Sequence, residues 1–157
     1  MNKIQLHQQL MVHLQQLLDN AKAAAKRAHE TATSEENIAE NKYDTLALEA
    51  GYLAQGQSQR VNQCQTDIDT CSSLPTNKSS IGGLGSLVVL VDELEQATYL
   101  LICPVAGGVK LTWDTHTVLV VTPQSPIGAA LLNKSENDSI SITVAAKEQH
   151  YEILQII

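Results

Sequence analysis

Three acidic residues at a regular spacing, Glu36, Glu40 and Asp44, are the side chains of this sequence best placed to do chemistry. Residues four apart lie on one face of a helix, so Glu36 and Glu40 could reach a common metal ion together. Carboxylate oxygens are ligands that Mg²⁺ prefers, and one or two suffice when phosphates complete the site. Acidic residues at a helix N-terminus also stabilise the helix dipole as solvated caps, so both roles stay open.

A set of basic residues, Lys22, Lys26 and Arg27, lies on neighbouring turns of the preceding segment. Such a patch could contact RNA or DNA phosphates. The alternative is a solvated face on which Lys26 and Arg27 pair with Glu30. The sequence has 17 acidic and 10 basic residues, a net charge of −7, which argues against a protein that coats nucleic acid.

The cysteines and histidines show no spacing that indicates a nucleophile or a zinc site. Cys64 and Cys71 stand seven residues apart and are expected to fill a helix interface, and Cys103 is expected in a strand core. We therefore expect no independent enzyme activity. The odd number of cysteines and the lack of a long apolar run predict a reduced, cytoplasmic protein without a membrane segment.

Two long helices are expected to position the charged residues. The first, over residues 2–31, has a coiled-coil seam of apolar or small residues at spacings of three and four. Its members are Ile4, His7, Met11, Leu14, Leu18, Ala21, Ala25 and Ala28. Residues 31–34 interrupt the pattern, and Thr33 or Ser34 could cap a second helix, with Glu36 completing a capping box.

The second helix is expected to run to about residue 71. Its predicted seam comprises Tyr43, Leu46, Ala50, Leu53, Gln57, Val61, Cys64, Ile68 and Cys71. A short turn between long helices predicts an antiparallel coiled-coil hairpin over residues 1–74, with its tip at about residues 30–41. Thirty helical residues span roughly 45 Å, which is longer than a compact domain needs.

The hydrophobic period changes after a polar, glycine-rich linker at residues 75–85. Beyond the linker, alternating and short apolar runs predict strands. The expected strands cover residues 86–92, 97–103, 109–113, 117–121, 139–145 and 149–156. Residues 86–157 are therefore expected to form a small antiparallel β domain with one short helix, which makes the fold class α+β.

The short helix carries the most specific motif, Ser125-Pro-Ile-Gly-Ala-Ala-Leu-Leu132. Ser125 can cap the helix, and Pro126 fits its first position, where no backbone donor is needed. Asn133 follows as a left-handed residue that ends the helix.

This motif and the Asp138 turn resemble the C-terminal domain of the Gre-type transcription elongation (transcript cleavage) factors, which bind bacterial RNA polymerase. The family motif reads Ser-Pro-Ile-Gly-x-Ala-Leu-Leu-Gly, then a charged turn, then Gly-Asp. Asn133 and Asn137 replace those glycines here, and asparagine is the residue that best tolerates a left-handed backbone after glycine. The resemblance implies an FKBP-like β domain behind an N-terminal helical hairpin.

The resemblance also implies a partner, RNA polymerase, which a monomer would bind at the rim of the secondary channel. The implied contact residues are Gln124, Ser125, Pro126 and Ile127. In the family, two carboxylates at the hairpin tip help to hold Mg²⁺ in the polymerase active centre and so activate cleavage of backtracked RNA by the polymerase. Glu36 and Glu40 are the implied carboxylates here. They would meet the Mg²⁺ and the RNA 3′ end only in the complex, and no stably bound cofactor is expected.

The tip departs from the family pattern, in which an aspartate stands three residues before a Glu-Asn pair. If Glu40 matches the family glutamate, Asn37 occupies the aspartate position, and if Glu36 matches it, Thr33 does. Three functions therefore stay open. The protein could stimulate RNA cleavage, occupy the channel as a regulator or inhibitor of the same fold, or be a coiled-coil interaction protein unrelated to transcription.

Overall fold

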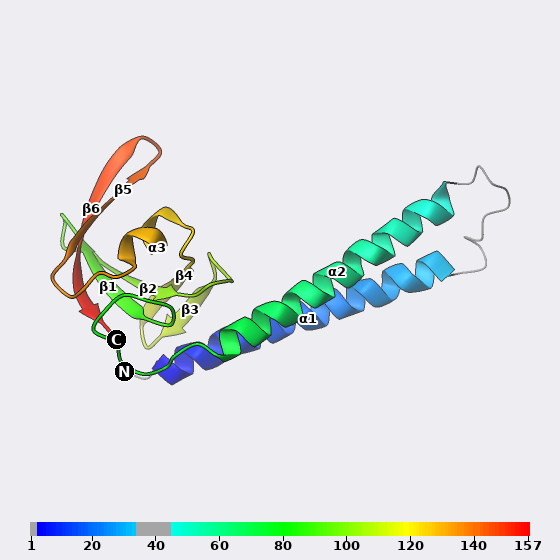
Figure 1. Ribbon diagram of the computed structural model, residues 1–157, viewed down its shortest axis with the longest axis horizontal. Coiled ribbons are helices and arrows are strands. Elements are labelled where there is room, and N and C mark those ends of the chain that lie inside the picture. Colours follow the sequence, from blue (N-terminus) through cyan, green and yellow to red (C-terminus); the bar gives the residue numbers. More distant parts are fainter. Residues whose placement is uncertain (1–2, 34–44) are drawn as a thin grey trace. The chain divides into compact units, whose positions relative to one another are not determined.

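The computed structural model describes residues 3–33 and 45–157 (Figure 1). The chain forms two compact units, one comprising Met1–Met11 and Thr70–Ile157 and the other Val12–Asp69. The first unit holds the β sheet together with one end of each long helix, and the second holds the rest of the helices. The predicted domain boundaries follow the change in hydrophobic period and stay a prediction, whereas the compact units divide the helices near residues 11 and 70.

The two long helices, α1 (Lys3–Thr33) and α2 (Leu46–Ser72), run antiparallel within the second unit (Figure 1). The predicted seam of α1 is confirmed by the burial of Leu14, Leu18, Ala21 and Ala28. It was wrong at Ile4, which is 50% exposed, because the first turns of α1 bury Leu6 and Leu10 inside the first unit instead. No helix in the described part of the chain is long and apolar enough to cross a membrane.

The predicted seam of α2 is wrong at one position, Leu53. Leu53, predicted to lie in the seam, is 56% exposed, whereas Ala54 beside it is partly buried. The seam is confirmed at the other described positions, which are half-buried or buried: Ala50, Gln57, Val61, Cys64, Ile68 and Cys71. Tyr43 and the side chain of Leu46 lie outside the described part of the chain.

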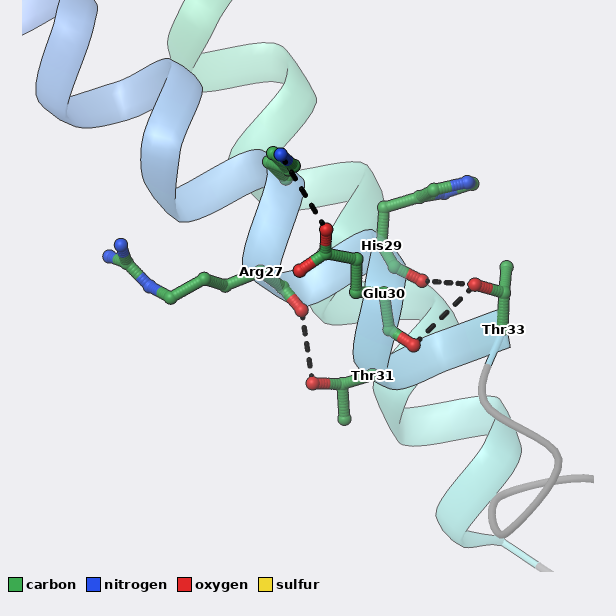
Figure 2. Close-up of polar contacts among 6 residues, drawn as sticks. Arg27, His29, Glu30, Thr31 and Thr33 are labelled. Atoms are coloured by element: carbon green, nitrogen blue, oxygen red, sulfur yellow. Dashed lines mark hydrogen bonds and ion pairs between the residues drawn. The ribbon is translucent and has the colours of Figure 1, made fainter.

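The prediction that Thr33 could cap the second helix was wrong, because Thr33 is the last residue of α1. The hydroxyl of Thr31 donates to the carbonyl oxygen of Arg27 at 3.0 Å, and that of Thr33 donates to the carbonyl of His29 at 2.8 Å (Figure 2). These bonds to the preceding turn satisfy hydroxyl groups that would otherwise favour a turn. Ser34 and most of the predicted tip lie outside the described residues.

The first unit is built on one six-stranded sheet in the order β3-β4-β2-β1-β6-β5. The strands are β1 (Leu87–Asp92), β2 (Ala97–Ile102), β3 (Lys110–Trp113), β4 (His116–Val121), β5 (Ser139–Val144) and β6 (Lys147–Ile156). All six predicted strands are confirmed, with ends that differ by at most two residues. Alternating apolar residues specify them, as in β5, where Ile140 and Ile142 are buried and alternate with exposed Ser139, Ser141 and Thr143.

The prediction of a fully antiparallel sheet was wrong for one pair of strands. β2 and β4 pair in parallel, with Leu100 opposite Leu119, while β3 lies outside β4 at the sheet edge. The chain leaves β2, forms the edge strand β3, and then turns back so that β4 lies between β3 and β2. β4 is antiparallel to β3 and therefore runs in the same direction as β2. The short helix α3 (Pro126–Leu131) follows β4 and buries Leu131 in the apolar core of the sheet.

Candidate functional site

The loop between β4 and α3 is fixed by the side chain of Ser125. The Ser125 backbone is extended, with φ −73° and ψ 149°, and its Oγ accepts a hydrogen bond from the Gly128 N–H at 3.1 Å. The same hydroxyl donates to the Thr122 carbonyl oxygen at 2.7 Å. Pro126 occupies the first helical position. The predicted cap and the predicted place of the proline are both confirmed.

Gly128 lies against the backbone of the same loop. A Cβ at this position would overlap the carbonyl oxygen of Thr122 and would lie 2.8 Å from the Ser125 Oγ. The Thr122 carbonyl also accepts a hydrogen bond from the Ser125 N–H at 2.9 Å. Three hydrogen bonds within the loop therefore hold it together, and the backbone of Thr122 lies so close to Gly128 that only glycine fits there.

Exposure divides the four predicted docking residues into two pairs. Gln124 and Pro126 are exposed, whereas Ser125 and Ile127 are half-buried. Ile127 packs against the core cluster that contains Leu131, Ile140 and Ile153, and Ser125 forms the helix cap. Gln124 and Pro126 thus present their side chains to solvent, while Ser125 and Ile127 anchor the loop.

The turn after α3 keeps the geometry expected for glycine. Asn133 and Asn137 both have left-handed backbones, with φ 61° and φ 70°, as predicted. The Asn133 N–H donates to Gly82 O at 2.9 Å, and the Asn137 N–H donates to Ile153 O at 2.7 Å. The Asp138 carboxylate accepts from the Ser135 N–H at 2.7 Å. The two asparagines therefore adopt the left-handed backbone of the turn, and both of their N–H groups are hydrogen-bonded.

The predicted tip carboxylates, Glu36 and Glu40, lie outside the described residues, so the metal site stays a prediction. Within residues 3–33 and 45–157, no group of three or more histidine, cysteine, aspartate or glutamate side chains could hold a metal ion.

The basic residues of α1 face solvent. Lys22, Lys26 and Arg27 are all exposed, and Lys26 Nζ lies 3.8 Å from Glu30 Oε1. Figure 2 shows the Arg27 guanidinium extending away from the Glu30 carboxylate. The predicted pairing with Glu30 is thus confirmed for Lys26 and not for Arg27. The side chains of this ion pair are 78% and 61% exposed, so the pair contributes little to the stability of the helix. Binding of nucleic acid by the three basic residues stays a prediction.

Two residues near the start of α1 make contacts that the sequence pattern does not predict. Gln9 pairs with edge strand β3: its Nε2 donates to Thr112 O at 2.8 Å and its Oε1 accepts from Thr112 N at 3.0 Å. Lys3 is buried, and its Nζ donates to Asn77 O at 2.6 Å and to Ile157 O at 3.1 Å. Burial lowers the pKa of the Lys3 ammonium below its usual value of 10.5. Glutamine and lysine on a helix ordinarily mark the solvent face, so no local signal identifies either residue.

The cysteines are also arranged differently from the expectation. Cys103 is buried, as predicted, but the Sγ of Cys71 lies 3.2 Å from the Sγ of Cys103, and Cys64 is only half-buried. The sequence predicts that Cys64 and Cys71 fill the same helix interface, because they lie on one seam of the helix. The contact with Cys103 depends on tertiary structure, which the spacing does not encode.

Known proteins resemble this chain over its C-terminal part and over most of its length. Residues 83–157 match the family described as "Transcription elongation factor, GreA/GreB, C-term". A transcription elongation factor GreA from Syntrophobacter fumaroxidans is 29% identical over 153 residues, which cover 95% of this chain and 92% of the relative. A second GreA, from Helicobacter hepaticus, is 33% identical over 85 residues, which cover 54% of this chain and 47% of the relative. A solved structure of the transcription factor Gfh1 is 18% identical, with a TM-score of 0.41 and coverage of 93% and 92%.

Proposed function

We propose that this protein is a Gre-type elongation factor that binds bacterial RNA polymerase, because residues 83–157 match the GreA/GreB C-terminal domain family. The observation that carries the proposal is the geometry of the loop entering α3. Gln124 and Pro126 stand exposed on a base that Ser125 and Gly128 hold rigid. The exposed side chains of Gln124 and Pro126 would make the contact with the polymerase.

A rigid loop suits a docking role for a physical reason. Ordering side chains and loops on binding costs free energy, and a loop that is already ordered avoids most of that cost. The Gln124 amide offers a donor and an acceptor, and the Pro126 ring offers an apolar surface that loses little entropy on contact.

The helical hairpin would enter the secondary channel of the polymerase. α1 has 31 residues, and a helix of that length spans about 46 Å, which suits a probe that acts far from its docking surface. Glu36 and Glu40 supply oxygen ligands of the kind that Mg²⁺ accepts. A Mg²⁺ shared with the polymerase would stabilise the reacting oxygens during RNA cleavage, while the protein itself supplies no active site.

A second candidate function is occupation of the channel without stimulated cleavage. The sequence of the tip favours it, because either alignment with the family leaves the aspartate position without a carboxylate, as Asn37 or as Thr33. Neither an amide nor a hydroxyl carries the negative charge that helps to hold a divalent cation.

One assay separates the candidates. Purified bacterial RNA polymerase is halted in a backtracked complex, the protein and Mg²⁺ are added, and RNA length is followed. Shortened RNA with wild type, but not with Glu36→Ala/Glu40→Ala, supports cleavage stimulation. Glu49→Ala removes an exposed carboxylate on α2 and is the matched control, which should stay active.

The two other outcomes favour different candidates. Unchanged RNA together with displacement of a genuine cleavage factor supports channel occupation. Absence of any binding to the polymerase rejects both and favours a coiled-coil interaction protein unrelated to transcription.

A further inference from the structure

We propose that Cys71 and Cys103 are a site of reversible oxidation and form an intramolecular disulfide that fastens the last turn of α2 to the end of β2. The proposal does not depend on binding to polymerase. It rests on two buried thiols, both with 0% exposure, whose sulfur atoms lie 3.2 Å apart although the residues are 32 positions apart in sequence.

The backbone around each thiol is already fixed. The Cys71 carbonyl accepts hydrogen bonds from His7 Nε2 at 2.9 Å and from the Leu74 N–H at 3.1 Å. The Cys103 N–H donates to Val121 O at 2.9 Å, which extends the pairing of β2 with β4. A disulfide has sulfur atoms about 2.05 Å apart, so the two side chains need to close only a little over 1 Å.

The third cysteine provides an internal comparison. Cys64 precedes Cys71 by seven residues of the same helix, a rise of about 10.5 Å, which exceeds the Cα separation of about 7 Å that a disulfide tolerates. Cys64 is half-buried and is therefore more accessible to reagents than the buried Cys71 and Cys103. Selective bonding of Cys71 to Cys103 would thus reflect geometry rather than accessibility.

Hydrogen peroxide is the class of oxidant that fits, because it is small enough to reach buried sulfur during brief local opening. One thiol loses its proton, and the thiolate attacks a peroxide oxygen, breaking the O–O bond to give a sulfenic acid and one water. The second thiolate attacks the sulfenyl sulfur, forms the S–S bond and releases the second water. Two thiols and one peroxide thus yield one disulfide and two waters.

The disulfide would close a long loop between helix and sheet. The cross-link lowers the conformational entropy of the unfolded chain and so stabilises the folded protein. For a closed loop of about 30 residues, the expected rise in melting temperature is about 10 °C. Reduction by dithiothreitol should reverse the rise.

The test treats the full-length protein with hydrogen peroxide and analyses it by intact mass and non-reducing peptide mapping. Wild type and Cys64→Ser should each lose two hydrogen atoms and yield one peptide pair joined through Cys71 and Cys103. Cys71→Ser and Cys103→Ser should yield no such pair, while circular dichroism of the reduced variants checks that they fold. Oxidised Cys64→Ser should melt about 10 °C above its reduced form.

Other outcomes overturn the proposal. These are a bond that involves Cys64, a disulfide between two molecules, or an oxidised Cys64→Ser that melts no higher than the reduced protein. Retention of both thiols in wild type, at a peroxide dose that oxidises Cys64, would do the same without relying on any variant.

Discussion

Replacement of Ser125 by alanine tests the loop that carries the functional proposal. The substitution removes the acceptor for the Gly128 N–H and the donor to Thr122 O, and it changes little else because the side chain is small. We expect the β-sheet unit to lose stability while keeping its fold.

The magnitude follows from the two hydrogen bonds. Loss of a serine cap costs about 1 kcal/mol. The Thr122 carbonyl keeps a second partner, the Ser125 N–H at 2.9 Å, so it is not left unsatisfied. The second bond therefore contributes at most about 1 kcal/mol. The expected total is about 1–2 kcal/mol, which lowers the melting temperature by roughly 3–6 °C.

The assay can use the single tryptophan of the chain. Trp113 lies in β3, is 3% exposed and packs edge-on against Tyr99 with ring centroids 5.7 Å apart, so its fluorescence reports on the sheet unit. Urea unfolding of wild type, Ser125→Ala and Ser125→Thr would be compared. Threonine keeps both the donor and the acceptor, so its free energy of unfolding should stay within about 0.5 kcal/mol of wild type.

Two results would contradict the role assigned to the Ser125 hydroxyl. Ser125→Ala could prove as stable as wild type, which would mean that the cap contributes nothing. Alternatively, Ser125→Thr could be destabilised as much as alanine, which would mean that the shape of the side chain matters and its hydroxyl does not.

Three further substitutions test the anchoring contacts by the same fluorescence measurement. Gly128→Ala should destabilise the sheet unit by about 2 kcal/mol, because overlap with the Thr122 carbonyl outweighs the better helix propensity of alanine, and an unchanged stability would contradict the close approach. Gln9→Ala should cost about 1 kcal/mol through the two lost bonds to Thr112, whereas the exposed neighbour Gln8→Ala should cost nothing. Lys3 should make stability depend on alkaline pH, because burial lowers its pKa below 10.5 and the unfolded chain therefore binds more protons. The free energy of unfolding should rise with pH up to about 10.5 in wild type relative to Lys3→Gln, and a constant or falling difference would refute the sign.

The strands and the short helix could be predicted from the sequence because their signals are local. A period of two fixes β5 through Ile140 and Ile142, and the Ser-Pro pair fixes the start of α3. The left-handed residues Asn133 and Asn137 could also be predicted, since few residue types tolerate that backbone.

The features that were missed depend on contacts between distant residues. The parallel pairing of β2 with β4 is set by which strand of a hairpin returns to the sheet, and no residue pattern within either strand encodes that choice. The buried Lys3 and the close approach of Cys71 to Cys103 likewise arise from packing between segments far apart in the chain. The candidate docking loop is local and was found, but the division into exposed and supporting residues required the structure.

Equilibrium binding of the purified components tests whether the loop entering α3 docks on bacterial RNA polymerase. Wild type should bind, and Gln124→Ala/Pro126→Ala should bind at least about tenfold more weakly while keeping its Trp113 unfolding curve. Lys147→Ala, which removes an exposed side chain on β6 outside the loop, should bind like wild type. Equal affinity of the loop variant and wild type, or no binding by wild type, would show that this loop is not the docking surface.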